Sequence, residues 1–178
     1  MSSVPKITVN AQRVSDELEK LARFSDHEYP AVTRIIFTEN DLKAREYFKS
    51  LAREAGLHVR EDSIGNIFVR LGDENALGAV GTGSHCDAVP HAGRFDGTVG
   101  VFGGLEALRA LKTAGFQPKR PIEVVFFTSE EPTRFGIGCI GSRIMSNTIS
   151  LEKVAALRDK DGLSFDQARD SAGYKRAV

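Results

Sequence analysis

The chain has 178 residues, of which 41% are hydrophobic, and its 24 basic and 24 acidic side chains give a formal net charge of zero. This length and composition predict one soluble domain with a sizeable core, and the balanced charge does not favour a nucleic-acid or anionic-membrane partner. The N-terminus lacks the apolar segment of a secretory signal and no apolar run reaches spanning length, so we expect a cytoplasmic location.

The hydrophobic pattern alternates between the periods of helices and strands. In chain order it predicts a helix over residues 10–24, a helix over 38–55, strands over 57–62, 66–71 and 79–84, a helix over 97–114, a strand over 122–128 and short helices at 142–145, from 150 and from 164 to 173. The first two strands read as a hairpin at a sheet edge. Helices that alternate with strands indicate an α/β domain with helix-sheet-helix layers.

Local signals refine three of these elements. Thr38 and Asp41 have the spacing of a capping box at the start of the second helix, and Ser164 and Gln167 have it at the start of the last. Glycines recur at three- or four-residue spacing in the helix over 97–114. Because glycine otherwise weakens a helix, we expect these glycines to let the helix lie close against the sheet.

His85 and Asp87 follow the strand over residues 79–84. If the strand extends through them, residues two apart project from the same face, so one can bind a metal while the other orients it. A carboxylate on the second ring nitrogen commonly fixes a metal-binding histidine. The pair therefore predicts a histidine ligand with Asp87 as its orienting partner.

Three further acidic residues fall at element ends. Asp96 precedes the glycine-rich helix, where an aspartate can bridge two cations. Glu130 and Glu131 follow a very apolar strand, whose carboxyl end is a usual place for a site in an open α/β sheet. Two adjacent carboxylates there suggest that one binds a metal and the other acts as a general base.

Each of these residues has an ordinary structural interpretation as well. Asp96 can be a helix N-cap, Glu130 and Glu131 can be a solvated loop, and His85 can be a hydrogen-bonded core histidine. The combination of one imidazole and several carboxylates, each at a strand end or helix start beside glycines, favours a divalent-metal site.

Other candidates are weaker. His27 lies in a loop and lacks a partner at metal-ligand spacing in the sequence, and His91 lies between the stronger candidates, so we expect neither to bind metal. Cys86 and Cys139 have no recognisable base and orienting residue, which argues against a nucleophilic cysteine mechanism, and we expect both to be reduced thiols.

The motifs together resemble a known family. The sequences His85-Cys-Asp87, Gly93-Arg-Phe-Asp96-Gly97 and Thr128-Ser-Glu-Glu-Pro-Thr-Arg-Phe-Gly136 are similar to those of the M20 metallopeptidase superfamily. Within it, they most resemble the branch of allantoate and ureidoglycolate amidohydrolases and N-carbamoyl-L-amino acid hydrolases. The form of the last motif is closest to that of the ureidoglycolate enzymes. The resemblance runs from about residue 10 to the end of the chain.

The resemblance implies a three-layer, zinc-exopeptidase-like α/β domain that binds two divalent ions, Mn²⁺ or Zn²⁺. It assigns His85, Asp96 and Glu131 as metal ligands and Glu130 and Asp87 as catalytic residues. It also implies that residues 1–178 form the N-terminal part of the catalytic domain, without the lid or dimerisation domain and without the later ligands. Longer members of the branch are expected to be homodimers, and the oligomeric state of this chain stays open.

Three functions remain in competition. The first is a metal-dependent amidohydrolase that cleaves ureidoglycolate or allantoate, or an N-carbamoyl amino acid, by metal-activated water. The second is a dinuclear metallo-exopeptidase, which shares the same motifs. The third is an inactive fragment or an interaction module, because a two-metal site built only from His85, Asp96 and Glu131 would be under-coordinated.

Overall fold

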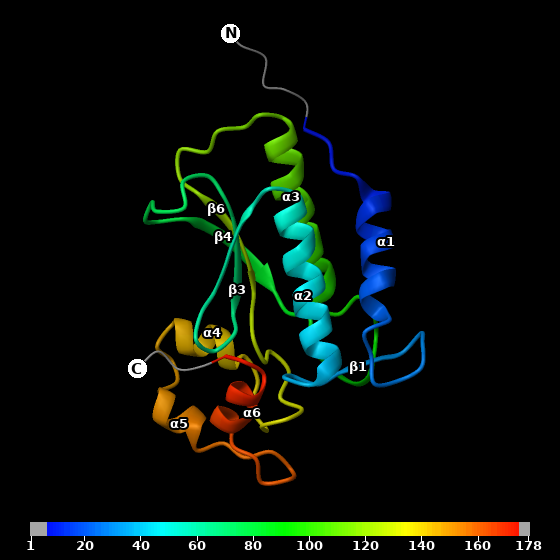
Figure 1. The fold of residues 1–178 in the computed structure, drawn as a ribbon, viewed down its shortest axis with the longest axis vertical. Helices are drawn as coiled ribbons and strands as arrows, with labels where there is room; N and C mark the ends of the chain where they lie inside the picture. The colour runs from blue at the N-terminus through cyan, green and yellow to red at the C-terminus, as the bar shows by residue number, and fades with distance from the viewer. Residues whose placement is uncertain (1–6, 175–178) are drawn as a thin grey trace.

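The computed structural model describes residues 7–174 and centres on a four-stranded sheet. In chain order the elements are α1 (Ala11–Ala22), β1 (Val32–Arg34), α2 (Glu39–Glu54), β2 (His58–Glu61), β3 (Ile67–Leu71), β4 (Val80–Ser84), β5 (Ala88–Ala92), α3 (Thr98–Thr113), β6 (Ile122–Phe126), α4 (Ile140–Met145), α5 (Leu151–Ala155) and α6 (Phe165–Ser171). Figure 1 shows their arrangement.

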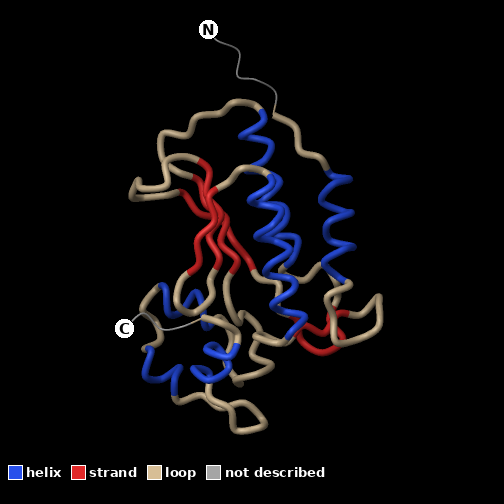
Figure 2. The backbone as a smooth tube through the Cα atoms, viewed as in Figure 1, coloured by secondary structure: helices blue, strands red, loops and turns tan. Residues whose placement is uncertain are grey.

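The main sheet has the strand order β2-β3-β6-β4 (Figure 2). Strand β3 pairs antiparallel with both β2 and β6, whereas β4 and β6 run parallel. The predicted hairpin at the sheet edge is therefore confirmed. The parallel pair matters most for function, because the carboxyl ends of β4 and β6 lie side by side.

Helices α2 and α3 lie against one face of the sheet, and α1 packs outside α3 (Figure 1). The three short helices α4, α5 and α6 gather beyond the carboxyl ends of β4 and β6. The predicted α/β class is confirmed. Among the described residues, none of the helices combines the length and the apolar character needed to cross a bilayer.

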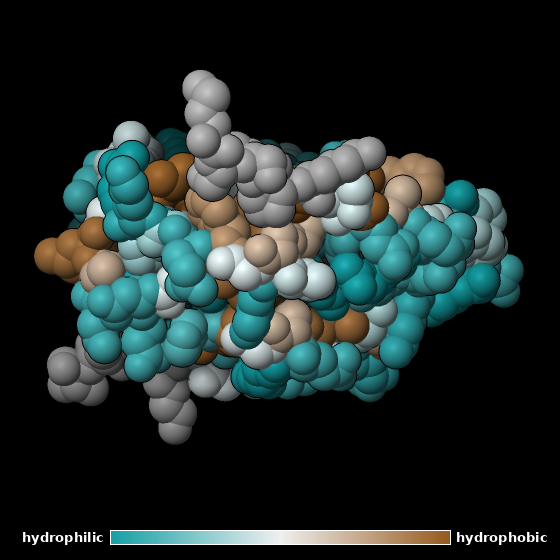
Figure 3. Space-filling model, turned by 90° about the horizontal axis from the view of Figure 1, so that it is seen from above, coloured by the Kyte–Doolittle hydropathy of each residue, from teal (hydrophilic) through white to brown (hydrophobic). Residues whose placement is uncertain are grey.

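Successive side chains along the strands point to opposite faces of the sheet, and the two faces have different neighbours. The face toward the helices carries the buried side chains of Val69, Val124 and Phe126, which join the main core. The opposite face carries Glu123, which accepts hydrogen bonds from Arg70 at 2.9 Å and from Arg60 at 3.3 Å. Figure 3 looks at the end of the molecule opposite α4–α6, where hydrophilic residues predominate and apolar ones form small separate patches.

Two glycines explain how closely α3 approaches the sheet. A Cβ atom on Gly100 would lie 2.6 Å from the Ser84 Cβ, and one on Gly104 would lie 2.9 Å from Val124. The expectation that glycines bring this helix close is confirmed for these two. Gly103, on the same helix, faces open space.

The structure differs from the sequence-based expectations at two places. Strands β1 and β5, for which no element was predicted, pair with each other in a separate two-stranded sheet. The capping box predicted at Thr38 is absent: the Asp41 carboxylate instead accepts from the Phe37 N–H and the Arg45 guanidinium, each at 2.8 Å. The Ser164 capping box is confirmed.

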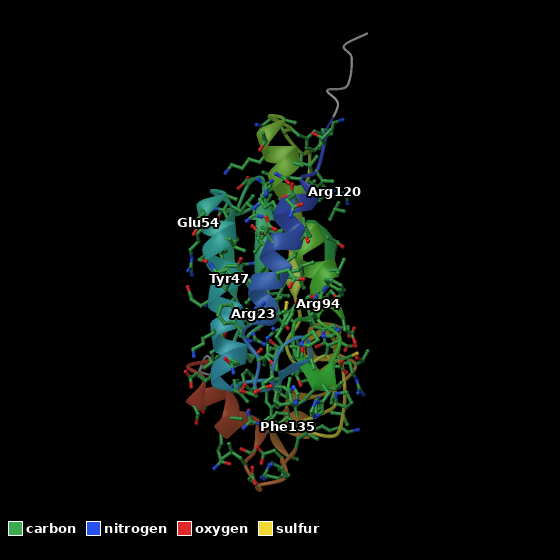
Figure 4. All side chains as sticks on the ribbon, turned by 90° about the vertical axis from the view of Figure 1, so that its right-hand side faces the viewer. Arg23, Tyr47, Glu54, Arg94, Arg120 and Phe135 are labelled. Carbon is green, nitrogen blue, oxygen red and sulfur yellow. The ribbon has the colours of Figure 1, made fainter. Side chains whose placement is uncertain are left out.

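A second apolar cluster holds α4–α6 against the rest of the domain. The rings of Phe37 and Phe135 both pack on Phe165, with centroids 5.5 and 5.2 Å away. Phe135 is labelled toward the lower end of the molecule in Figure 4. Phe135 thus anchors the segment that follows β6 to α6.

Truncation of Phe48 tests the packing of the main core. The Phe48 ring is fully buried and lies 5.7 Å from the rings of both Phe102 and Phe126. We expect Phe48→Ala to lower the free energy of unfolding by about 3–5 kcal/mol, because it leaves a cavity. Phe116→Ala, at a residue 43% exposed, serves as the control and should change it by about 0.5 kcal/mol or less. Equal losses in urea unfolding would contradict this packing.

Candidate metal centre

The candidate centre lies where β4 and β6 end. Ser84 is in register with Phe126, and the Phe127 N–H donates to the Ser84 carbonyl at 2.8 Å. The residues that follow each strand therefore start from the same edge of the sheet, which is where open α/β sheets place ligands. His85 comes from β4, and Glu130 and Glu131 come from β6.

His85 is buried, and its two ring nitrogens have different surroundings. Nδ1 lies 2.9 Å from the main-chain oxygen of Asp87 and 3.6 Å from its carboxylate. A hydrogen on Nδ1 satisfies these acceptors and leaves the lone pair of Nε2 for a metal. Nε2 lies 3.5 Å from Glu130 Oε2, so it points into the carboxylates.

The charge around the ring changes its proton affinity. Burial lowers the pKa of His85, but hydrogen bonding to Asp87 and the negative charges of Asp87 and Glu130 outweigh it and raise the pKa to about 9. Electrostatically, the site stabilises a positive charge at this ring. A bound cation can supply that charge in place of a proton.

Asp87 connects the two strand ends. Its carboxylate is almost completely buried and accepts the backbone N–H of Glu130 at 3.3 Å and that of Glu131 at 3.0 Å. The residue predicted to orient His85 thus holds that ring chiefly through its main-chain oxygen. Its side chain fixes the backbone of both glutamates.

The donor set fits a divalent cation. One ligand atom each from His85, Glu130 and Glu131 lie within 4.8 Å of one another. Burial raises the pKa of Glu131, and the negative charge of Glu130 raises it further. A cation between these groups would offset the repulsion, and one imidazole with carboxylates suits Mn²⁺ or Zn²⁺.

Asp96 approaches from the other side but is not a member of that group of three. Its Oδ1 atom lies 3.9 Å from His85 Nε2, and its side chain is 62% exposed. The helix α3 has Gly97 as its N-cap, so Asp96 does not take the capping position that the sequence left open. All the predicted site residues therefore converge on one edge, with Asp96 at the solvent side.

Gly97 sets the distance between α3 and the histidine. Its φ of 65° is in the left-handed region, and a Cβ atom there would overlap the imidazole ring of His85. Glycine is thus required both by the backbone conformation and by the contact.

Asn66, which is fully buried, has no functional signal in the sequence. Its Oδ1 accepts from the Thr128 N–H at 2.8 Å, and its Nδ2 donates to Asp62 at 2.8 Å and to the Gly141 carbonyl at 3.3 Å. It fixes the segment that leads to the two glutamates. An asparagine at the start of a strand gives no sign of this contact, because Thr128 is 62 residues away.

Cys139 is the other residue whose place the sequence did not indicate. Its thiol donates to Glu130 Oε1 at 3.3 Å. Burial and this hydrogen bond raise the pKa of the thiol, so it stays protonated and can donate. In the Glu130 carboxylate, Oε1 therefore accepts a hydrogen bond from the Cys139 thiol, while Oε2 points toward His85.

The sequence model of peptidase family M28 matches residues 66–172, which include all of these site residues. The chain belongs to peptidase family M28. The resemblance seen in the sequence had pointed to the M20 superfamily, and the relatives below are the amidohydrolases that it predicted.

Curated relatives of this M28 member include three hydrolases. The chain is 51% identical over 169 residues to a ureidoglycolate hydrolase of Oryza sativa subsp. japonica and covers 94% of itself and 35% of that protein. It is 48% identical to a ureidoglycolate hydrolase of Arabidopsis thaliana, covering 94% and 36%. It is 32% identical to an allantoate amidohydrolase of Bacillus subtilis, covering 93% and 40%.

Solved structures agree with these relatives. AtUAH in complex with (S)-hydroxyglycine superposes with a TM-score of 0.90 at 45% identity over 96% of this chain and 41% of that one. A hydantoinase/carbamoylase family amidase from Burkholderia ambifaria gives 0.90 at 34% identity, over 96% and 42%. The chain thus spans well under half of the length of these proteins.

Gly97→Ala tests the contact between α3 and His85. We expect the dissociation constant for Zn²⁺ or Mn²⁺, measured by calorimetry, to rise about tenfold or more, because the new methyl group displaces the imidazole. Gly103→Ala is the control: its methyl group meets no atom within 4 Å, so it should leave metal affinity unchanged. If both variants bound metal like the parent, Gly97 would not be setting the place of His85.

Proposed function

We propose that this chain carries the N-terminal part of the catalytic domain of a metal-dependent amidohydrolase, one that cleaves a carbon–nitrogen bond of a ureido substrate and releases ammonia. The observation that carries the proposal is the grouping of His85, Glu130 and Glu131, with ligand atoms within 4.8 Å, at the shared end of β4 and β6. Relatives named as ureidoglycolate hydrolases make ureidoglycolate the favoured substrate.

His85, Asp96 and Glu131 are the residues that would hold metal, as two Mn²⁺ or Zn²⁺ ions. Bound divalent cations lower the pKa of a coordinated water and polarise a carbonyl. Three protein donors are too few for two ions. The chain covers only 35% to 41% of the relatives most similar to it, so further ligands from other residues would be needed to complete a two-metal site.

Glu130 would act as the general base. Its side chain is 37% exposed, and Oε2 is directed toward the His85 ring while the Cys139 thiol holds Oε1. Oε2 can therefore receive the proton of the attacking water. As the carbon–nitrogen bond breaks, the same oxygen can return that proton to the departing nitrogen, which leaves as ammonia.

Asp87 would be a positioning residue. It keeps the hydrogen of His85 on Nδ1 through its main-chain oxygen, and its carboxylate fixes the backbone of Glu130 and Glu131. The relative places of the base and the two metal-binding side chains thus depend on this one residue. Such fixed geometry is what lets a base and a ligand act on one water molecule.

A second candidate, a dinuclear exopeptidase, is favoured by the name of the matching family model. The two activities give different products: ammonia from ureidoglycolate or allantoate, and free amino acid from a dipeptide. A third possibility, a metal-binding module without turnover, would bind the ion and release neither product. Assaying both products from the metal-loaded protein separates the three.

Glu131→Gln and Glu130→Gln should separate binding from catalysis. We expect Glu131→Gln to raise the dissociation constant for metal by roughly 100-fold, because a ligand is lost. Glu130→Gln should retain metal and, in the longest natural form of the protein, reduce turnover by about 10²–10⁴-fold. Unchanged turnover in Glu130→Gln would remove Glu130 from the role of base.

Glu39→Gln is a suitable control for both variants. Glu39 pairs with Lys43 on the exposed surface of α2, and its own side chain is 82% exposed. Neither metal content by mass spectrometry of the native protein nor turnover should change. A loss of metal in this variant would show that the assay reports general surface charge and not the proposed centre.

A further inference from the structure

Two histidines outside the candidate metal centre lie against each other. His27 belongs to the turn after α1 and His91 belongs to β5, and both side chains are exposed. Their ring centroids are 4.1 Å apart, and the ring planes are inclined by 73°. The two residues are 64 positions apart in the sequence, so sequence spacing does not show that His91 is the partner of His27.

The backbones that carry the two rings are fixed to one strand. The Ser25 hydroxyl accepts from the His27 N–H and from the Thr33 N–H, each at 3.0 Å. The His91 N–H in turn donates to the Thr33 hydroxyl at 3.0 Å. Thr33 of β1 is therefore the common anchor, and the pair does not depend on a chance meeting of two free loops. Arg23 and Arg94, which are close in sequence to His27 and His91 respectively, are labelled in Figure 4.

The ring nitrogens are available in the form that a metal requires. His27 Nδ1 lies 3.1 Å from the Glu28 main-chain oxygen, which favours a hydrogen on Nδ1 and a free lone pair on Nε2. Within residues 7–174 the His91 ring makes no hydrogen bond. His91 also has a φ of 59°, a conformation that is uncommon for a residue other than glycine and that clusters at ligand sites.

We propose that His27 and His91 form a second transition-metal site, separate from the centre at His85. Two imidazoles bound to one tetrahedral ion have their ring centroids roughly 5 Å apart, from metal–nitrogen distances of about 2.1 Å. The observed centroids are closer than this, at 4.1 Å, so both rings would have to rotate apart to bind one ion. Imidazole donors suit Zn²⁺, Ni²⁺ and Cu²⁺ better than Mg²⁺ or Ca²⁺. Water fills the remaining positions.

An ion at this site would join the turn after α1 to β5. Strand β5 is the connection between Asp87 and Asp96, so the ion would restrain the segment that links two parts of the main centre. The expected role is structural: the site adds a cross-link and takes no part in bond cleavage.

The experiment is a Zn²⁺ titration of the 178-residue chain followed by NMR of the histidine ring signals. The chain has four histidines, so each signal can be assigned with one variant. We expect the signals of His27 and His91 to shift together with one midpoint, and that of His85 to follow a midpoint of its own. The signal of His58, which pairs with Glu74 on the surface, should not move.

The variants are His27→Gln and His91→Asn, since asparagine tolerates the left-handed backbone at position 91. Each should raise the dissociation constant of the second site about tenfold or more and leave the partner's ring signal unmoved by Zn²⁺. His58→Gln is the matched control and should change neither. Both replaced residues are exposed, and an unchanged melting temperature without metal would verify that the fold is retained.

The proposal would be overturned if His27 and His91 shifted with different midpoints, or if neither shifted below millimolar Zn²⁺. Their contact would then be ring packing alone. The result is independent of the main centre: in Glu131→Gln the joint shift of His27 and His91 should persist. In the parent chain, a His85 signal that does not respond to Zn²⁺ while the second site binds would count against the proposed function and leave this inference standing.

Discussion

The contact on which the rest of the structure depends is made by the buried carboxylate of Asp87. It accepts the backbone N–H groups of Glu130 and Glu131, while the main-chain oxygen of the same residue holds His85 Nδ1. One residue thus joins the ends of two parallel strands. Because backbone hydrogen bonds to a buried carboxylate are strong and directional, the imidazole and the two glutamates are held as one unit.

The surroundings of this unit stabilise an arrangement that is unfavourable by itself. Adjacent glutamates lie beside a buried aspartate, and burial together with the negative charge of Glu130 raises the pKa of Glu131. Fixed neighbours hold the group in place: Asn66 binds the backbone at Thr128, and Gly97 lets α3 lie against the His85 ring. The repulsion among these carboxylates lowers the stability of the fold, and packing in the two apolar clusters offsets that loss. Such a local cost is usual at a functional site.

Sequence reasoning reached the α/β class, the hairpin edge and the side chains of the candidate site, because periodicity and strand ends are local properties. It could not reach contacts that join distant segments. The pairing of β1 with β5 was missed because both strands are short and ordinary in composition. Asn66 and Cys139 form hydrogen bonds with residues that are distant in the sequence or not recognisable as partners from it. His27 shows the same limit, since its partner His91 is remote in the sequence. The prediction of a capping box at Thr38 was wrong because the Asp41 carboxylate forms a buried ion pair with Arg45 instead.

The most direct test of the account is a crystal structure of the chain loaded with Mn²⁺ or Zn²⁺, with the ion located by its anomalous scattering. The account predicts a peak about 2.0–2.2 Å from both His85 Nε2 and a carboxylate oxygen of Glu131. Saturating metal with no peak at that position, or a His85 ring turned so that Nε2 faces away from the glutamates, would contradict it.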